Sequence, residues 1–411
     1  MNWKLIRKID TYVGIPLMYA GQCLRKAWRG PRRVPAGEPA RRILLVKFWG
    51  IGNIFMMLPA VQTLKAGYPD AEIDLLTLET NRIAAAAIKT FRAVHAIDTR
   101  NVFRFIRTSL STMRALRRRE YDIVVDFEQF ARFSAIVCAV IGKKISIGFN
   151  TAGQHRHFFY SRPVRYENGI HMVRSYRSLS ISAFQEGIGH EPVSPVVRTD
   201  PDGRDLMRRL GIRMDRPTVL MHIGTSSNFK ERRWPIRHYA ALADLLIDNH
   251  NAQVVLSGLK EETPCASEMA DFARSDGMII DMIGKLDFDD FFSLIRLCDL
   301  VVSADTAPVH LASACGTPVV GLYGPNTPLL YGPWGGNGLA CYENLACSPC
   351  ITNFNAKLHV CRHPEGKGAC MDKIRPEDVY RKIRERFFSP QPASHSKGTE
   401  TLAHGRPGQI H

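Results

Sequence analysis

The sequence predicts an α/β fold made of two doubly wound domains that face each other across a cleft. The chain has 411 residues, which exceeds the size of one ordinary hydrophobic core. Short apolar stretches alternate along it with longer stretches of helical spacing. The apolar stretches are nearly continuous, which is typical of parallel strands that helices cover on both faces of a sheet.

The alternating pattern occurs twice, and each occurrence predicts one domain. In the first, strands are expected at 43–48, 72–78, 93–98, 121–127 and 144–149, with helices near 54–66, 81–90, 102–119 and 130–141. In the second, strands are expected at 218–224, 252–258, 278–284, 300–305 and 318–324, with helices near 236–249, 263–274, 288–298 and 307–315. The predicted segments are a basic arm and linker (1–41), an N-terminal domain (42–195), a C-terminal domain (196–388) and a disordered tail rich in Ser, Pro, Gly and His (389–411).

The N-terminal arm is strongly basic and predicts contact with an anionic membrane surface. The formal net charge of the chain is +16, and residues 1–42 carry ten Lys and Arg against two acidic residues. Apolar side chains recur there every three or four residues, which is typical of an amphipathic helix on a lipid surface. The longest uncharged stretch, 11–24, has 14 residues, fewer than the ~20 that a transmembrane helix needs. A helix packed on the protein's own body is the alternative interpretation.

Two other roles for a basic N-terminus do not fit the sequence. A signal peptide would end in a small-residue cleavage site, whereas further basic residues follow here. Nucleic acid is not an expected partner, because the charge is concentrated in one arm and the chain lacks zinc-finger, helix-turn-helix and RNA-recognition signatures.

The stretch LVVSADTAPVHLASACGTPVVGLYGPNTP at 300–328 predicts an anion site. A strand ends at Asp305 and a helix of small residues begins at once. The backbone N–H groups of Thr306 and Ala307, together with the helix dipole, can therefore hold a phosphate. His310 lies one turn further along and would support that phosphate or hold the strand tip. Asp305 also fits the ordinary role of a helix cap.

A second loop, HIGTSSNFKERRWP at 222–235, leaves the carboxyl end of another strand. Its hydroxyl groups and positive charges come from Thr225, Ser226, Lys230 and Arg232. We expect this loop to converge with 305–310 on one nucleotide, because both follow strands of the same sheet. A solvated basic loop is the alternative. The chain has no GxGxxG after a strand and no GxxxxGK[ST], so dinucleotide and P-loop sites are not supported.

Three stretches resemble the signature regions of glycosyltransferase family 9, the ADP-heptose:lipopolysaccharide heptosyltransferases. They are VKFWGIGNIFMMLPAVQTLKAGYPDAEIDLLT, HIGTSSNFKERRWPIRHYAALADLL and SADTAPVHLASACGTPVVGLYGP, and the resemblance covers about 42–380. It implies a GT-B fold of two Rossmann-like domains and an inverting, metal-independent transfer of a sugar from an ADP-sugar. The usual acceptor of the family is the lipopolysaccharide inner core on the cytoplasmic membrane face.

The resemblance also implies roles for individual residues. The C-terminal domain would hold the nucleotide-sugar donor, and the N-terminal domain would face the acceptor. The donor-binding residues would be Thr225, Ser226, Lys230, Arg232, Asp305, Thr306, Ala307 and His310, with Gly50 and Gly52 in the loop that faces the donor.

The opening loop departs from the family pattern. The family usually has Gly-Asp there, and that Asp is assigned as the base that deprotonates the acceptor hydroxyl, whereas this chain has Gly52-Asn53. Asn53 cannot take up a proton at neutral pH, so we expect it to orient the acceptor hydroxyl or a sugar oxygen. Glu128, at the end of the strand at 121–127, is expected to accept the proton, with Asp126 in reserve. Either carboxylate could instead cap the following helix.

Four cysteines form a compact set in the segment 341–370. Cys347-x2-Cys350-x10-Cys361-x8-Cys370 has one pair with the short spacing typical of zinc ligands. A structural zinc at these four residues is one interpretation, and reduced thiols that merely pack together are the other.

These observations predict a glycosyltransferase that needs no cofactor for catalysis. It would move heptose or a related sugar to lipopolysaccharide or another surface glycan, as a cytoplasmic protein peripheral to the inner face of the cytoplasmic membrane. One alternative is a non-catalytic sugar-nucleotide-binding homologue that has lost its base. Another is a different GT-B enzyme, such as a nucleotide-sugar epimerase.

Overall fold

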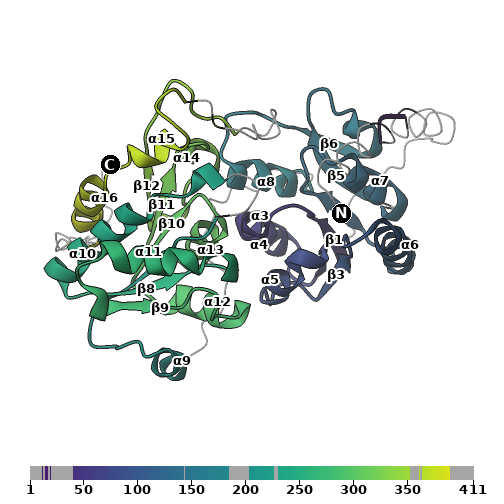
Figure 1. Ribbon diagram of the computed structural model, residues 1–411. Helices are drawn as coiled ribbons and strands as arrows, with labels where there is room; N and C mark the ends of the chain where they lie inside the picture. Colours follow the sequence, from purple (N-terminus) through teal and green to yellow (C-terminus); the bar gives the residue numbers. More distant parts are fainter. Residues whose placement is uncertain are drawn as a thin grey trace, which may run out of the picture.

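The computed structural model describes residues 40–142, 144–184, 203–225, 230–351, 361 and 363–388, together with Tyr12, 14–16 and Tyr19. Two six-stranded sheets, each with helices on both faces, make up two lobes (Figure 1). All strand pairs in both sheets are parallel. This confirms the predicted fold of two doubly wound domains. The predicted arm lies almost wholly outside the described residues, as do the boundary at 195 and the tail from 389.

The first sheet has the strand order β3-β2-β1-β4-β5-β6. Its strands are β1 (Arg42–Val46), β2 (Glu72–Leu78), β3 (Ala93–Ile97), β4 (Ile123–Asp126), β5 (Ile145–Asn150) and β6 (Arg162–Arg165). Its helices are α3 (Ile51–Met56), α4 (Leu58–Gly67), α5 (Arg82–Ala86), α6 (Val102–Arg118), α7 (Arg132–Ile141) and α8 (Met172–Ile181), with 3-10 turns η1 (Glu79–Asn81) and η2 (Arg156–Phe159).

The second sheet has the order β12-β11-β10-β7-β8-β9. Its strands are β7 (Thr218–His222), β8 (Gln253–Ser257), β9 (Ile279–Asp281), β10 (Leu300–Ala304), β11 (Val319–Tyr323) and β12 (Gly338–Tyr342). Its helices are α9 (Arg204–Arg209), α10 (Ile236–His250), α11 (Pro264–Phe272), α12 (Phe288–Leu297), α13 (Ala307–Cys315), α14 (Pro328–Tyr331), α15 (Ala369–Asp372) and α16 (Pro376–Ile383). Short turns are η3 (Lys230–Arg232), η4 (Lys260–Glu262), η5 (Asp276–Met278) and the π-helical η6 (Arg384–Phe388).

The ten predicted strands are all present, but the structure adds one edge strand to each sheet. The first of them, β6, has the sequence RPVR and is partly exposed along its length. The second, β12, has the sequence GLACY and is also only partly buried. Edge strands need no continuous apolar run and tolerate proline, so the pattern that identified the central strands does not detect them.

The strand order places one crevice on each sheet. The order reverses between β1 and β4 in the first sheet and between β7 and β10 in the second. In open α/β sheets, ligands bind outside the carboxyl ends of the strands at such a reversal. The loops after these four strands therefore border the two crevices.

The two domains meet through α3 and α13, which lie side by side between the sheets (Figure 1). The rings of Phe55 and Phe292 approach to 6.4 Å between centroids across this junction. One cluster of buried apolar residues is continuous through both domains. The predicted helix at 54–66 is in fact two helices, because Pro59 lies in the first turn of α4 and the chain breaks at Met57.

No helix in the described part of the chain combines the length and the apolar character that crossing a bilayer requires.

Candidate active site

The loop after β1 turns directly into α3 and carries Asn53 at its tip. Gly50 caps the helix with a φ of 83°, a left-handed conformation that glycine adopts without strain. The Asn53 side chain donates from Nδ2 to the carbonyl oxygen of Trp49 at 3.0 Å. Its amide oxygen accepts no hydrogen bond from a described residue, so this oxygen is the group that the tip can offer to a substrate.

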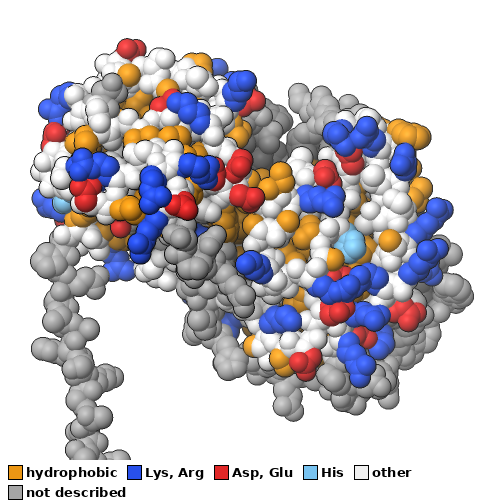
Figure 2. Space-filling model, turned by 90° about the horizontal axis from the view of Figure 1, so that it is seen from below, with side chains coloured by type: hydrophobic (Ala, Val, Ile, Leu, Met, Phe, Trp, Pro, Cys, Tyr) orange, Lys and Arg blue, Asp and Glu red, His pale blue; other side chains and the backbone are white. Residues whose placement is uncertain are grey.

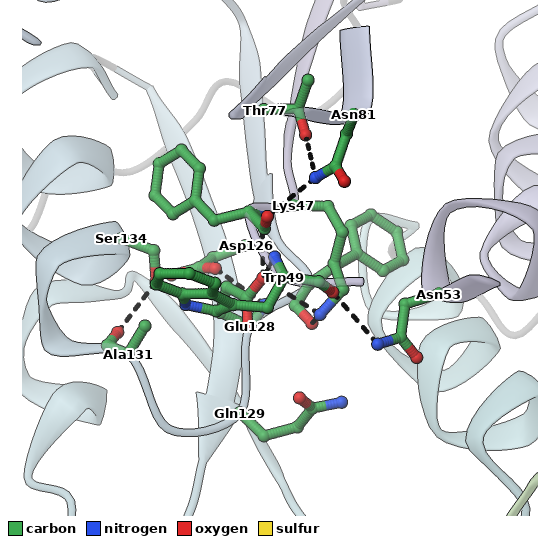
Figure 3. Close-up of polar contacts among 12 residues, drawn as sticks. Lys47, Trp49, Asn53, Thr77, Asn81, Asp126, Glu128, Gln129, Ala131 and Ser134 are labelled. Atoms are coloured by element: carbon green, nitrogen blue, oxygen red, sulfur yellow. Dashed lines mark hydrogen bonds and ion pairs between the residues drawn. The ribbon is translucent and has the colours of Figure 1, made fainter. Parts of the chain in front are cut away.

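Glu128, which follows β4, holds the backbone of this loop in place (Figure 3). Its Oε1 accepts hydrogen bonds from the backbone N–H groups of Phe48 at 2.7 Å and Trp49 at 2.9 Å. The same oxygen lies 3.0 Å from Nζ of Lys47, and both side chains are almost completely buried. From the other side, Nδ2 of Asn81 donates to the carbonyl oxygen of Phe48 at 2.8 Å. The loop is thus fixed by a carboxylate, an ammonium and an amide.

A second ion pair lies directly behind Glu128 and is fully buried. Nη2 of Arg156 is 2.7 Å from Oδ2 of Asp126, and both side chains are 0% exposed. The hydroxyl group of Tyr160 donates to the same Oδ2 at 2.6 Å, and Oδ1 accepts from the backbone N–H of Glu128 at 2.9 Å. Nη1 of Arg156 also donates to the backbone oxygen of Glu128. These contacts make Asp126 a structural residue and leave it no role as a reserve base.

On the facing domain, α13 begins at Ala307 with Thr306 as its cap residue. The Thr306 side chain makes no capping hydrogen bond to the helix. Asp305 does not cap it either: Oδ2 accepts from Nδ2 of Asn326 at 2.8 Å and lies 4.0 Å from Nη1 of Arg232. The same Nη1 donates to the backbone oxygen of Asp305 at 3.1 Å. The helix start therefore presents its first N–H groups beside a guanidinium, which suits an anion.

His310 joins the two halves of the site. Its ring packs so closely on α3 that a Cβ at Gly52 would lie 2.6 Å from Cδ2 of His310 and 3.3 Å from Cα of Ala307. Nδ1 is buried and has no hydrogen-bond partner among the described residues. Burial lowers the pKa of His310 to about 4, so the ring is neutral at physiological pH. Helices α3 and α13, which follow β1 and β10, are therefore in direct contact.

The loop after β7 contributes Thr225, which is held by Glu262 of η4, a residue that the sequence analysis did not identify. Oε1 of Glu262 accepts from the backbone N–H of Thr225 at 2.9 Å and from Nη2 of Arg233 at 3.1 Å. Oε2 accepts from the backbone N–H of Leu259 at 2.7 Å. The hydroxyl group of Thr225 is buried without a described partner, which leaves it for a ligand. Lys230 is exposed at the start of η3, and Ser226 lies outside the described residues.

A cavity of about 920 Å³ opens between the domains beside this site. Its walls come from residues 164–178 of the first domain and 328–335 of the second. His171 crosses the gap, with Nε2 3.0 Å from the backbone oxygen of Gly332, and its charge would affect His310. Arg165, Arg174 and Trp334 also line the cavity. Cations and hydroxyl groups on the wall of the first domain, facing an aromatic ring on the wall of the second, suit an acidic or phosphorylated sugar.

The four cysteines of the predicted zinc site interact with one another. Burial, with contributions from the neighbouring thiols of Cys347 and Cys361, raises the pKa of Cys350 to about 11. Burial likewise raises the pKa of Cys370 to about 12, with contributions from the other three thiols. In the described part of the chain, however, no group of three or more metal-binding side chains is arranged to hold a metal ion. Residues 352–360 and 362 of this segment lie outside the described residues, and zinc here stays a prediction.

Comparison with known proteins identifies relatives over most of the chain. The family model described as glycosyltransferase family 9 (heptosyltransferase) matches residues 109–360. Lipopolysaccharide core heptosyltransferase OpsX of Haemophilus influenzae is 24% identical over 319 residues, and the match covers 75% of this chain and 87% of that protein. Lipopolysaccharide heptosyltransferase 1 of Escherichia coli K12 is 24% identical over 73% of this chain and 93% of its own length.

Solved structures show the same fold. ADP-heptose lps heptosyltransferase II of E. coli superposes with a TM-score of 0.66 at 20% sequence identity, covering 85% of this chain and 98% of that chain. E. coli heptosyltransferase WaaC with ADP gives a TM-score of 0.62 at 21% identity over 84% of this chain and 99% of the other.

Proposed function

The chain belongs to glycosyltransferase family 9, and from this premise we propose that it moves heptose or a related sugar from an ADP-sugar to a lipopolysaccharide or another surface glycan. The chain is a transferase, and its relatives are named as lipopolysaccharide heptosyltransferases. The single observation that supports the donor site best is the start of α13, flanked by Arg232 and pressed against Gly52 of the facing domain. Related solved structures contain ADP or an ADP-heptose analogue.

In the proposed reaction the acceptor hydroxyl attacks the anomeric carbon while the nucleoside diphosphate leaves from the opposite face. The attack forms the new glycosidic bond and inverts the anomeric carbon. Negative charge builds up on the leaving diphosphate, where the N–H groups of α13, the side chain of Arg232 and the nearby Lys230 would stabilise it. The donor's nucleoside would extend toward Thr225 and Glu262, and His310 would contribute a neutral ring nitrogen.

Replacing Asp305 by alanine is expected to weaken ADP binding about tenfold or more without unfolding the protein. The carboxylate orients Asn326 and lies near Arg232, and hydrogen bonds to charged groups contribute ~1.5–3 kcal/mol each. Calorimetric titration of ADP into the wild type and the variant gives the two dissociation constants. Asp271→Ala, at an exposed position on α11, is the matched control and should bind ADP normally. An unchanged affinity in Asp305→Ala, or a preference for UDP over ADP, would contradict the assignment of the ADP-binding site to the start of α13.

Asn53 and Glu128 share the role that one carboxylate plays elsewhere in the family. Asn53 would orient the acceptor hydroxyl through its free amide oxygen. Glu128 would accept the proton through Oε2, the oxygen that no described residue engages, while Oε1 holds the loop. The bracing contacts also support a second reading, in which Glu128 only positions the tip.

Glu128→Gln separates these readings, because the amide oxygen of glutamine can still accept from Phe48 and Trp49. If Glu128 is the proton acceptor, the turnover rate should fall by about 10²–10⁴-fold, far more than in Asn53→Ala, with ADP affinity unchanged. A variant as active as the wild type, together with a steep gain in Asn53→Asp, would leave Glu128 as a positioning residue only.

We further propose that the acceptor lies along the interdomain cavity and that the enzyme works at the inner face of the cytoplasmic membrane. The cavity supports the first part, because Arg165 and Arg174 place two cations beside the reaction centre. The composition of the N-terminal stretch supports the second part, since the ten Lys and Arg residues of residues 1–42 suit anionic lipid.

A further inference from the structure

Helix α6 carries apolar side chains that are exposed to solvent instead of packing in the core. Val102, Phe103, Ile106 and Leu110 are 44%, 74%, 51% and 47% exposed, and they make up four of the twelve large apolar side chains exposed in the described part of the chain. Phe103, Ile106 and Leu110 are spaced by three and four residues, so they lie on one side of the helix. The residues that α6 buries, Ser109 and Leu116, lie further round the helix, about 100° from the centre of this side.

The same helix is basic and has no acidic residue. It contains Arg104, Arg107, Arg114, Arg117 and Arg118. Among these only Arg104 forms an ion pair with a described residue, at 3.4 Å from Asp98. At 100° per residue, the other four arginines fall on the outward side that also carries Phe103. In Figure 2 the lobe of the first domain, on the right, has Lys and Arg side chains along its edge with hydrophobic side chains between them.

Charge decides what can cover this face. A second copy of the chain would bring the same arginines against these ones, which opposes pairing at low salt. A bilayer with anionic headgroups accepts both components, because apolar side chains enter the boundary between headgroups and acyl chains while guanidinium groups bind phosphates. Each basic side chain near such a surface contributes about 1 kcal/mol.

We propose that the outward face of α6 is a lipid-contacting surface that docks the N-terminal domain on an anionic membrane. The surface is part of the folded domain and is separate from the basic arm at 1–41. It would hold the domain that faces the acceptor against the leaflet in which a glycolipid acceptor resides. Binding to lipid does not depend on which sugar is transferred, so this proposal and the proposed function can fail independently.

Co-sedimentation of the full-length protein with vesicles tests the proposal. The vesicles contain phosphatidylcholine alone or phosphatidylcholine with phosphatidylglycerol. The double variant Phe103→Ser/Leu110→Ser removes apolar surface at constant charge, and Arg107→Gln/Arg114→Gln removes charge at constant apolar surface. Leu259→Ser/Phe272→Ser alters two exposed apolar residues of the second domain and serves as the control. All replaced side chains are exposed, so the variants should retain the melting temperature of the wild type.

Both α6 variants should bind the anionic vesicles about tenfold more weakly, while the control binds as the wild type does. High salt should weaken vesicle binding by the wild type. It should also reduce the difference in binding between the wild type and Arg107→Gln/Arg114→Gln, because salt screens the charges that this variant lacks. Unchanged partitioning in both α6 variants, or no binding of the wild type to anionic vesicles, would overturn the proposal. A wild type that is dimeric in sedimentation velocity, with the serine variant monomeric, would assign the face to a second copy instead.

Discussion

Replacing Gly52 by alanine is expected to reduce transferase activity by about 100-fold while both domains remain folded. The new Cβ would lie 2.6 Å from Cδ2 of His310 and 3.3 Å from the backbone of Ala307. His310 is buried and its ring is wedged between the helices, so α3 and α13 must move apart to make room. A displacement of ~1 Å at a reaction centre can cost about 10²-fold in rate. Steady-state kinetics with donor and acceptor measure the effect.

Gly277→Ala is the matched control for this change. A Cβ at Gly277 would meet no atom within 4 Å, and its backbone is not in the left-handed region. The control should have wild-type activity. Gly52→Ala should also lower the melting temperature, because the new methyl group collides with the His310 ring. Adding His310→Ala should raise the melting temperature part of the way back, because the smaller side chain leaves room for that methyl group. If Gly52→Ala alone retains full activity, the close contact between the two helices is not required in the active enzyme.

Arg156→Met is expected to lower the free energy of unfolding of the N-terminal domain by about 3–5 kcal/mol. The substitution leaves Asp126 buried and without its guanidinium partner, and it also removes hydrogen bonds to Ser134 at 3.0 Å and to the backbone oxygen of Glu128. An unpaired buried carboxylate must be neutralised or the site must open. Urea titration followed by circular dichroism measures the loss.

An exposed ion pair in the same protein gives the comparison. Arg208 and Asp205 lie 2.8 Å apart, but their side chains are 73% and 78% exposed. Arg208→Met should change the unfolding free energy by less than about 0.5 kcal/mol. If Arg156→Met costs as little as Arg208→Met, the buried pair does not stabilise the loop that carries Glu128.

Much of the fold could be predicted because central parallel strands have a strong local signal. Strands such as β2 and β10 are short apolar runs, and Leu300–Ala304 is buried throughout. The edge strands lack this signal, since one face and one edge are solvated and the side chains need not be apolar. The break between α3 and α4 could have been predicted from Pro59, because a proline is tolerated in the first turn of a second helix but disrupts the interior of a single long one.

The candidate site was predictable where a strand end supplies it and unpredictable where distant residues complete it. Asp305 follows a strand directly and Asn53 follows one after a short loop, so their placement at the crevice follows from chain order. Lys47 and Glu128 also follow strands, but their ion pair depends on the adjacency of β1 and β4. Arg156 lies 30 residues from Asp126 in a short 3-10 turn, and no local pattern marks it as a buried cation.

The neutral His310 between the domains makes this junction sensitive to acid. Its pKa of about 4 lies below the ordinary value of 6.5, so between these values the unfolded chain takes up a proton that the closed junction excludes. The stabilisation is fully present above pH 6.5 and is lost as the pH falls through 4. His171, on the cavity wall, also has a pKa lowered by burial and adds to the effect in the same direction. Mild acidification would therefore weaken the contact between the two domains.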